Sequence, residues 1–296
     1  MIDPTKCLIK SEISLASQTS YRVGGNAQWY AAPRNWQELS TCFEWYQSQD
    51  MPLTLLGAGS NLLISDRGIP GLTISTRYFR SYEFQDDSGL LTADAGEPIA
   101  NLAWKAAKRG LKGLEWAVGI PGTVGGAVVM NAGAHQQSIS DILVSATVID
   151  SNGDIKELTP ENLAYSYRTS NLQGGEKFVV KATLRLEPGY SKQEVMELAN
   201  SNWTKRKTTQ PYHLPSCGSV FRNPHPKAAA KLIEQLGLKG HKIGDAQIAE
   251  RHANFILNCG AAKASDIFQL IRYIQEKVEY HWSVSLEPEV KLLGEF

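Results

Sequence analysis

The 296-residue sequence lacks the features that define several protein classes. It has no surplus of either charge, because 30 Lys and Arg side chains balance 30 Asp and Glu side chains. Neutralising a nucleic-acid backbone needs a basic surplus, so we expect no nucleic-acid partner. The four cysteines form no CxxC pair, which argues against zinc knuckles, and we expect no metal site. Nor is a disulfide framework expected in a chain long enough to bury a full core.

Long apolar runs are also absent. The first fifteen residues contain no apolar segment of the signal-peptide kind, so we expect no secretion signal. The least charged stretch, residues 116–140, contains five glycines, a proline and several polar residues, which makes it a poor membrane span. We therefore expect a cytoplasmic protein with no membrane partner. We also expect a monomer.

Short apolar runs alternate with amphipathic helices in the first half of the chain. Asn35 is a candidate N-cap for a helix in which apolar residues recur at i, i+3, i+4 and i+7. Pro98 and Gly110 bracket a second helix. Short strands are expected at residues 53–56, 72–75, 90–93, 145–150 and 155–158.

The chain changes character near residues 188–191. Before this point, one face of a predicted strand carries alternating apolar side chains, namely Phe178, Val180, Ala182, Leu184 and Leu186. After it, we expect a helix through Val195, Leu198, Ala199 and Trp203. A later helix is expected from about Asp266 to Tyr280, with Ser265 as its cap. The pattern predicts a domain boundary at this change.

Two glycine-rich turns are candidates for binding an anion. The first follows the strand at 53–56 and consists of Gly57, Gly59, Ser60 and Asn61 with one alanine. The second lies within the charge-free stretch and contains Gly122, Thr123, Gly125 and Gly126. Backbone N–H groups in such turns bind diphosphates, whereas close packing of backbone against backbone is the structural alternative.

A basic segment follows in the last third of the chain. Residues 198–233 contain no acidic side chain and six basic ones, which are Lys205, Arg206, Lys207, Arg222, Lys227 and Lys231. Such a segment attracts a polyanion, although a solvated basic face is the common alternative. Because these charges surround the small residues PSCGS at 215–219, a second phosphate-bearing ligand and a two-substrate enzyme become the leading hypothesis.

Seven segments, in order, are similar to the motif set of the UDP-N-acetylenolpyruvoylglucosamine reductases. They are TSYRVGG (19–25), LLGAGSNLLISD (55–66), GLEWAVGIPGTVGGAVVMNAGA (113–134), YSYRTS (165–170), PSCGSVFRNP (215–224), HANFILN (252–258) and LEPEVKLLG (286–294). Together they span nearly the whole chain. That family makes UDP-N-acetylmuramate for bacterial peptidoglycan.

The resemblance implies an α+β fold with a two-lobed FAD-binding domain of the vanillyl-alcohol-oxidase (PCMH-like) type. Its lobes would occupy residues 1–76 and 77–189, and a smaller α+β substrate-binding domain would occupy residues 190–296. NADPH would reduce the flavin. The enolpyruvyl ether of the UDP-sugar would then accept a hydride and a proton.

The resemblance also implies roles for individual residues. Arg168 would stabilise the charge that develops on the substrate carboxylate, Glu289 would orient or polarise the intermediate, and Ser219 would donate the proton. The FAD site would include Arg22, Gly57, Gly59, Ser60, Asn61, Pro121, Gly122, Thr123, Gly125 and Gly126. Lys207 and Asn223 would lie near the phosphates or the sugar of the substrate.

The sequence departs from the common family pattern at some positions. Ala58 stands where a glycine is common, and only about ten residues separate Arg168 from the next strand. The chain thus resembles the subtype that lacks an inserted tyrosine segment, and we expect a more open substrate entrance. Cys217 is interpreted as a small residue lining the pocket, with a redox role as the alternative. Two other functions stay open: a different FAD oxidase or dehydrogenase, and a nucleotide-sugar binder without catalysis.

Overall fold

The computed structural model describes residues 8–296 and contains two compact units, each assembled from separate stretches of the chain. Unit 1 consists of the described residues up to Ser11, Trp29–Ala58 and Gly71–Arg206. Unit 2 consists of Glu12–Gln28, Gly59–Pro70 and Lys207–Phe296. Both helices and strands contribute to each unit, which confirms the predicted α+β class. The three predicted domains stay a prediction.

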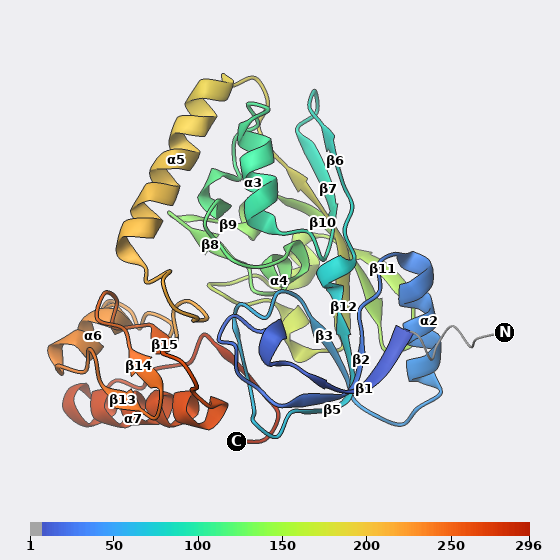
Figure 1. Ribbon diagram of the computed structural model, residues 1–296. Coiled ribbons are helices and arrows are strands. Elements are labelled where there is room, and N and C mark those ends of the chain that lie inside the picture. Colours follow the sequence, from blue (N-terminus) through green and yellow to red (C-terminus); the bar gives the residue numbers. More distant parts are fainter. Residues whose placement is uncertain (1–7) are drawn as a thin grey trace. The chain divides into compact units, whose positions relative to one another are not determined.

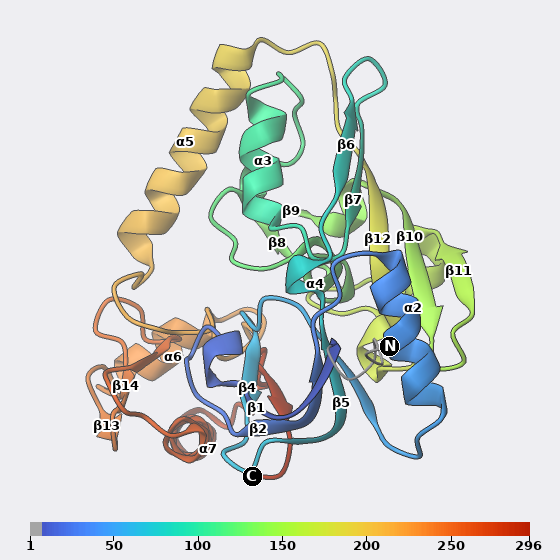
Figure 2. The same ribbon diagram turned by 45° about the vertical axis from the view of Figure 1, so that its right-hand side comes forward.

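A five-stranded antiparallel sheet runs through unit 1, with the order β11-β10-β12-β7-β6 (Figure 1). Its strands are β6 (Tyr82–Gln85), β7 (Leu90–Asp94), β10 (Leu143–Asp150), β11 (Ile155–Leu158) and β12 (Lys177–Arg185). Figure 2 shows β6 and β7 as one hairpin. The strands predicted at 90–93, 145–150 and 155–158 are thereby confirmed.

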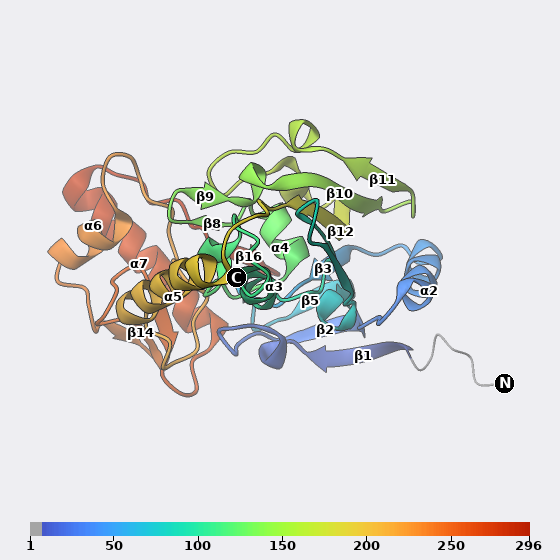
Figure 3. The same cartoon turned by 90° about the horizontal axis from the view of Figure 1, so that it is seen from above.

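One face of this sheet is covered by α3 (Ile99–Ala107) and α4 (Val124–Val129). The apolar stripe of α3 packs in one core with strand residues such as Leu91 and Leu184. Figure 3 shows α4 beside β12, which it contacts. Pro98 is the N-cap of α3, and Gly110 follows the end of the helix with φ +75°. The predicted position of this helix between Pro98 and Gly110 is therefore confirmed.

The predicted alternation along β12 is wrong at one point. Phe178 and Val180 pack in a different core from Ala182 and Leu184. The register against β10 shifts between Thr147 and its neighbour Val148, which leaves one extra residue in β12. A β-bulge of this kind sends the following side chains to the opposite face, so that both faces of the strand are buried.

The second core of unit 1 lies under α2 (Trp36–Gln47), where Leu39, Cys42 and Phe43 are buried. Asn35 Oδ1 accepts a hydrogen bond of 3.0 Å from Glu38 N, which confirms the predicted N-cap. The adjoining four-stranded sheet has the order β1-β2-β5-β3, in which β3 and β5 are parallel. Its strands are β1 (Ile9–Ser14), β2 (Asn26–Ala31), β3 (Leu53–Leu56) and β5 (Ile69–Ser75).

Unit 2 contains three short antiparallel strands and two helices with their own core. The elements are β13 (Lys242–Ile243), β14 (Ala246–Ile248), β15 (Ile256–Asn258), α6 (Ala229–Gln235) and α7 (Ala264–Trp282). A second, parallel pair joins β4 (Leu62–Ile64) to β16 (Lys291–Leu293), although 226 residues separate the two strands from end to start. This pair brings Gly59, Ser60 and Asn61 of the first glycine-rich turn close to the C-terminal motif within unit 2.

Of the two helices predicted in the last third of the chain, one needs a correction at its cap. Helix α7 starts at Ala264 with Lys263 at the N-cap, so Ser265 is not its cap. Instead, Asp66 accepts hydrogen bonds from the backbone N–H groups of Ala264 (2.8 Å) and Ser265 (2.9 Å). The other predicted helix is confirmed as α5 (Lys192–Thr209), in which Val195 is buried and Leu198 is 40% exposed.

The remaining elements are short. A two-stranded ribbon forms from β8 (Gly133–Ala134) and β9 (Gln137–Ser138). The 3-10 helices are Ala16–Gln18, Thr76–Tyr78, Glu115–Ala117, Ile139–Asp141, Pro160–Leu163 and Asn171–Gly174.

Candidate active site

In unit 1, the end of strand β3 meets the start of helix α4. A Cβ atom on Gly57 would lie 2.7 Å from Thr123 Oγ1, closer than a real Cβ approaches, so a larger residue would require the Thr123 side chain to move. Thr123 is buried and caps α4, because its hydroxyl oxygen accepts a hydrogen bond of 3.3 Å from Gly126 N. The two glycine-rich turns thus contribute neighbouring residues to one place, as a shared ligand site requires.

The glycines of the second turn serve different purposes. Gly125 N donates to Ala95 O at 2.9 Å, and a Cβ atom on Gly125 would lie 2.8 Å from Ala95 Cβ. This is the backbone packing that the sequence left open as an alternative. Gly126, by contrast, is exposed, and a Cβ atom there would meet only Thr123 Oγ1 at 3.6 Å. Gly122, beside the exposed Pro121, has φ +145° and accepts a hydrogen bond from Ile99 N at 3.2 Å.

The rest of the first turn belongs to unit 2. Gly59 has φ +62°, and a Cβ atom on it would collide with Gln18 O. Asn61, partly buried like Ser60, donates from Nδ2 to Glu289 O at 3.0 Å, and its own carbonyl accepts from Lys291 N at 3.0 Å. Asn61 therefore holds the backbone of Glu289, the residue predicted to orient or polarise the intermediate.

Ser219 and Glu289 lie on paired segments of unit 2, although 70 residues separate them. Glu289 N donates to Val220 O at 2.7 Å, and Phe221 forms an antiparallel bridge with Pro288. Both Ser219 and Glu289 are partly exposed. The structure thus brings two of the three predicted catalytic residues to neighbouring positions on the backbone.

Cys217, two residues before Ser219, is buried and bonded. Its Sγ donates to Leu62 O at 3.3 Å and lies 3.7 Å from Gly59 O. Burial raises the pKa of this thiol to about 12, against the opposing effect of hydrogen bonds to backbone atoms. A neutral thiol is a poor nucleophile, which favours the packing role over the redox alternative.

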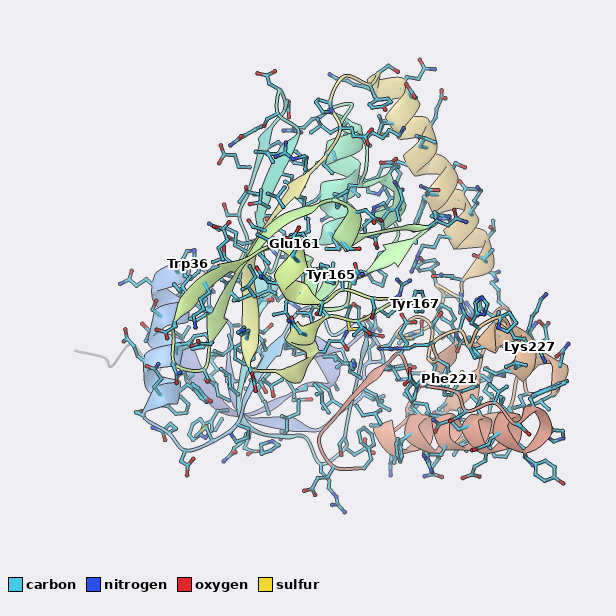
Figure 4. All side chains as sticks on the ribbon, turned by 180° about the vertical axis from the view of Figure 1, so that it is seen from behind. Trp36, Glu161, Tyr165, Tyr167, Phe221 and Lys227 are labelled. Carbon is cyan, nitrogen blue, oxygen red and sulfur yellow. The ribbon has the colours of Figure 1, made fainter. Side chains whose placement is uncertain are left out.

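Arg168 lies in unit 1 and has a backbone conformation that is uncommon outside glycine, with φ +56°. Its Nη2 donates to Gly133 O at 2.6 Å, and its guanidinium lies 4.9 Å from the ring centre of Tyr167. Gln173 Nε2 donates to Arg168 O at 2.9 Å. Figure 4 labels Tyr165 and Tyr167, which lead to Arg168 along the chain.

The three remaining predicted site residues lie in unit 2, namely Arg22, Lys207 and Asn223. Arg22 is exposed, has φ +57° and donates its backbone N–H to Thr19 O at 3.2 Å. Lys207 is exposed. Asn223 uses its Oδ1 to accept a hydrogen bond of 3.1 Å from Ala229 N, at the first residue of α6. Asn223 therefore has a structural contact in addition to its predicted role at the substrate.

Asn254 contacts the proposed site but was not among the predicted site residues. Asn254, in the segment HANFILN, is buried and bonds to the two residues that follow Ser219. Its place in this family-like segment was the only sequence feature that pointed to Asn254, and that feature did not indicate a role. The meeting of Arg168 with Ser219 and Glu289 stays a prediction.

Comparison with known proteins identifies both parts of the chain. Residues 27–159 match the model of an FAD binding domain, and residues 210–293 match that of the UDP-N-acetylenolpyruvoylglucosamine reductase C-terminal domain. The UDP-N-acetylenolpyruvoylglucosamine reductase of Synechocystis sp. is 58% identical over 294 residues, covering 99% of this chain and 93% of the relative. The corresponding protein of Acaryochloris marina is 54% identical over 295 residues, covering 100% and 96%.

The chain belongs to the UDP-N-acetylenolpyruvoylglucosamine reductase family. The reductase structure from Thermus caldophilus has a TM-score of 0.83 at 34% identity and covers 97% of this chain and 99% of that one. Membership of this reductase family confirms the resemblance drawn from the seven motifs. It also confirms FAD as the cofactor, because an FAD-binding model matches the part of the chain that contains both glycine-rich turns.

Two features of residues 8–296 concern other kinds of site, a membrane span and a metal site. None of their helices has the length and apolar character needed to cross a bilayer. The same residues contain no group of three or more His, Cys, Asp or Glu side chains placed to hold a metal ion.

Proposed function

We infer that this chain reduces the enolpyruvyl group of UDP-N-acetylenolpyruvoylglucosamine with NADPH and forms UDP-N-acetylmuramate for peptidoglycan synthesis. The observation that carries this function is the 58% identity with a reductase over 99% of the chain. The glycine contacts of unit 1 agree with it, because Gly57 and the start of α4 approach each other with small side chains and no fixed charge.

The residues present fit FAD, which when bound supplies the hydride that the enolpyruvyl double bond accepts. We propose that its diphosphate is held by the predicted turn residues, with Arg22 close to the flavin. These turn residues are Gly57, Gly59, Ser60, Asn61, Pro121, Gly122, Thr123, Gly125 and Gly126. Gly125 supports the site through packing against Ala95.

The remaining steps fall to side chains of this protein. Reduction at the methylene carbon places negative charge on the substrate carboxylate, and the planar guanidinium of Arg168 matches a carboxylate and stabilises that charge. Ser219 then donates a proton to the carbon next to the carboxylate. A serine hydroxyl is a weak acid, but the enediolate is a strong base, so this transfer is feasible. Glu289 orients the intermediate from the segment paired with Val220.

The substrate also carries a diphosphate and a sugar. We propose that Lys207 and Asn223 bind near these groups, within the basic segment of residues 198–233. We further propose that the protein works in the cytoplasm as a monomer, without a nucleic-acid or membrane partner.

Ser219→Ala tests the function and the assignment of the proton donor together. The FAD-loaded wild-type protein is expected to oxidise NADPH only when the enolpyruvyl UDP-sugar is present. In Ser219→Ala, flavin reduction by NADPH is expected to persist, while turnover falls by roughly two to four orders of magnitude because the proton donor is lost. Steady-state NADPH absorbance and stopped-flow flavin absorbance measure the two quantities.

Ser216→Ala is the matched control, because Ser216 lies in the same loop with similar burial. Turnover close to that of the wild type in Ser219→Ala would remove Ser219 from the mechanism. A wild-type protein that binds no flavin, or that makes peroxide from NADPH without the UDP-sugar, would contradict the function itself.

A further inference from the structure

The backbone that follows Ser219 is held by a single buried side chain, that of Asn254. Phe221 N donates to Asn254 Oδ1 at 3.0 Å, and Asn254 Nδ2 donates to Phe221 O at 2.8 Å. Val220 N also donates to the backbone carbonyl of Asn254 at 2.9 Å. Phe221, labelled in Figure 4, is thus paired with a side-chain amide that acts like a neighbouring strand.

Asn254 is itself rigidly placed. It is 3% exposed, and its backbone N–H donates to His252 Nδ1 at 3.3 Å. It lies two positions before the start of β15 (Ile256–Asn258), and β15 is paired with β14. Water does not readily reach these buried groups. Loss of the Asn254 amide would therefore leave the backbone N–H and C=O of Phe221 without hydrogen-bond partners.

The same short segment is bound on its other side by the backbone of Glu289 and Val290. Val220 donates its N–H to Asn254, while its carbonyl accepts from Glu289 N at 2.7 Å and Val290 N at 3.3 Å. Residues 220–221 therefore lie between Asn254 and the Glu289 segment. A shift of this backbone would move Ser219 and would also change its register with Glu289.

We propose that Asn254 is a positioning residue for the reduction. It touches neither substrate nor cofactor. Its amide fixes the backbone of residues 220–221, and this places the Ser219 hydroxyl for proton transfer in register with Glu289. The proposal rests on the proposed role of Ser219 as proton donor.

The test compares Asn254→Ser with Asn258→Ser. Asn258 is a matched control, because it is 4% exposed, ends the same strand, and donates from Nδ2 to Tyr21 O at 2.9 Å. Both substitutions are expected to lower the thermal unfolding midpoint. Only Asn254→Ser is expected to lower turnover, by about 10- to 100-fold, because small misplacements of a reacting group are costly.

The readout that separates positioning from stability is the proton-transfer step. Stopped-flow mixing of the reduced enzyme with the enolpyruvyl UDP-sugar is performed in H2O and D2O. The solvent isotope effect is expected to rise in Asn254→Ser and to match the wild type in Asn258→Ser. The rate at which NADPH reduces the flavin is expected to be the same in both variants.

Equal isotope effects and equal turnover in the two variants would overturn the proposal, because Asn254 would then contribute to stability only. Asn254→Asp provides a second variant of nearly the same shape, which keeps the acceptor for Phe221 N and loses the donor to Phe221 O. Failure of both Asn254 variants to fold, when Asn258→Ser and Asn258→Asp fold, would assign Asn254 to folding and also overturn it. Full activity of Ser219→Ala, measured alongside, would instead identify a failure of the proposed function.

Discussion

At the scale of single residues, the backbone of Arg168 is the most informative feature. A non-glycine residue with φ +56° is held in an uncommon conformation, and such residues concentrate at functional sites. Its carbonyl is held by Gln173, and its guanidinium is held by Gly133 O. These contacts orient the planar guanidinium of Arg168, which lies in a short turn. They give a physical reason for an arginine at this position beyond its positive charge.

Arg168→Lys retains the charge and removes the planar fork. We expect kcat to fall by roughly 10²- to 10³-fold, because an ammonium group cannot make the two parallel hydrogen bonds that stabilise a carboxylate as its charge develops. Steady-state kinetics with the enolpyruvyl UDP-sugar give kcat and KM separately. Arg185→Lys, at the exposed last residue of β12 in the same unit, is the control, and equal kcat values for the two variants would exclude the proposed role of Arg168.

At the scale of elements, the start of α7 depends on a residue far away in the sequence. Asp66 accepts two backbone N–H groups at the first turn of that helix. Burial opposes ionisation of this carboxyl, but the hydrogen bonds from Ser265 and Ala264 outweigh it, and the net pKa of Asp66 is lowered. The stabilisation is therefore present above the usual pKa of an aspartate and is lost as the pH falls through the lowered value.

Asp66→Ala removes this cap. The free energy of unfolding at pH 7 is expected to fall by about 1 kcal/mol, the usual cost of losing an N-cap side chain. Urea denaturation followed by circular dichroism measures it, with Asp87→Ala in the exposed turn between β6 and β7 as the control. The difference between Asp66→Ala and the wild type is expected to shrink at low pH, where the carboxyl is protonated. A difference that stays constant down to pH 3 would contradict the capping argument.

At the scale of the whole molecule, both units contain buried groups that resist ionisation. In unit 1, burial and the nearby Glu38 raise the pKa of Cys42 to about 12. In unit 2, burial raises the pKa of Cys217 to about 12, and burial together with Cys217 raises the pKa of Tyr21 well above its usual value. Each group is neutral in the folded protein at a pH where the unfolded chain has released the proton.

We therefore expect stability to fall in alkali. A raised folded pKa means that the stabilisation is complete below the unfolded thiol pKa, about 8.5 to 9, and is lost as the pH rises toward the folded value. Urea midpoints between pH 7 and 10.5 measure this loss. Cys42→Ala removes one of these groups and is expected to make the decline shallower. A midpoint that does not change across this range would contradict the assigned burial of these protons.

Local sequence patterns determined the parts of the protein that depend on near neighbours. Asn35 and the apolar spacing after it specified α2, and the strands at 53–56 and 90–93 followed from short β-forming runs between turn signals. Seven ordered motifs were enough for the family and its cofactor, because each combines residue types that few other folds need in that order.

Only the tertiary structure decided the features that join distant segments. The bulge that divides β12 between two cores, the cap of α7 by Asp66, and the pairing of β4 with β16 all rely on contacts across many residues. For the same reason, the spacing of nearby residues could not predict the two hydrogen bonds between the Asn254 side chain and the Phe221 backbone. The spacing of apolar residues indicates which face of a helix or strand is buried. Hydrogen bonds between segments far apart in the sequence depend instead on how the folded chain brings those segments together.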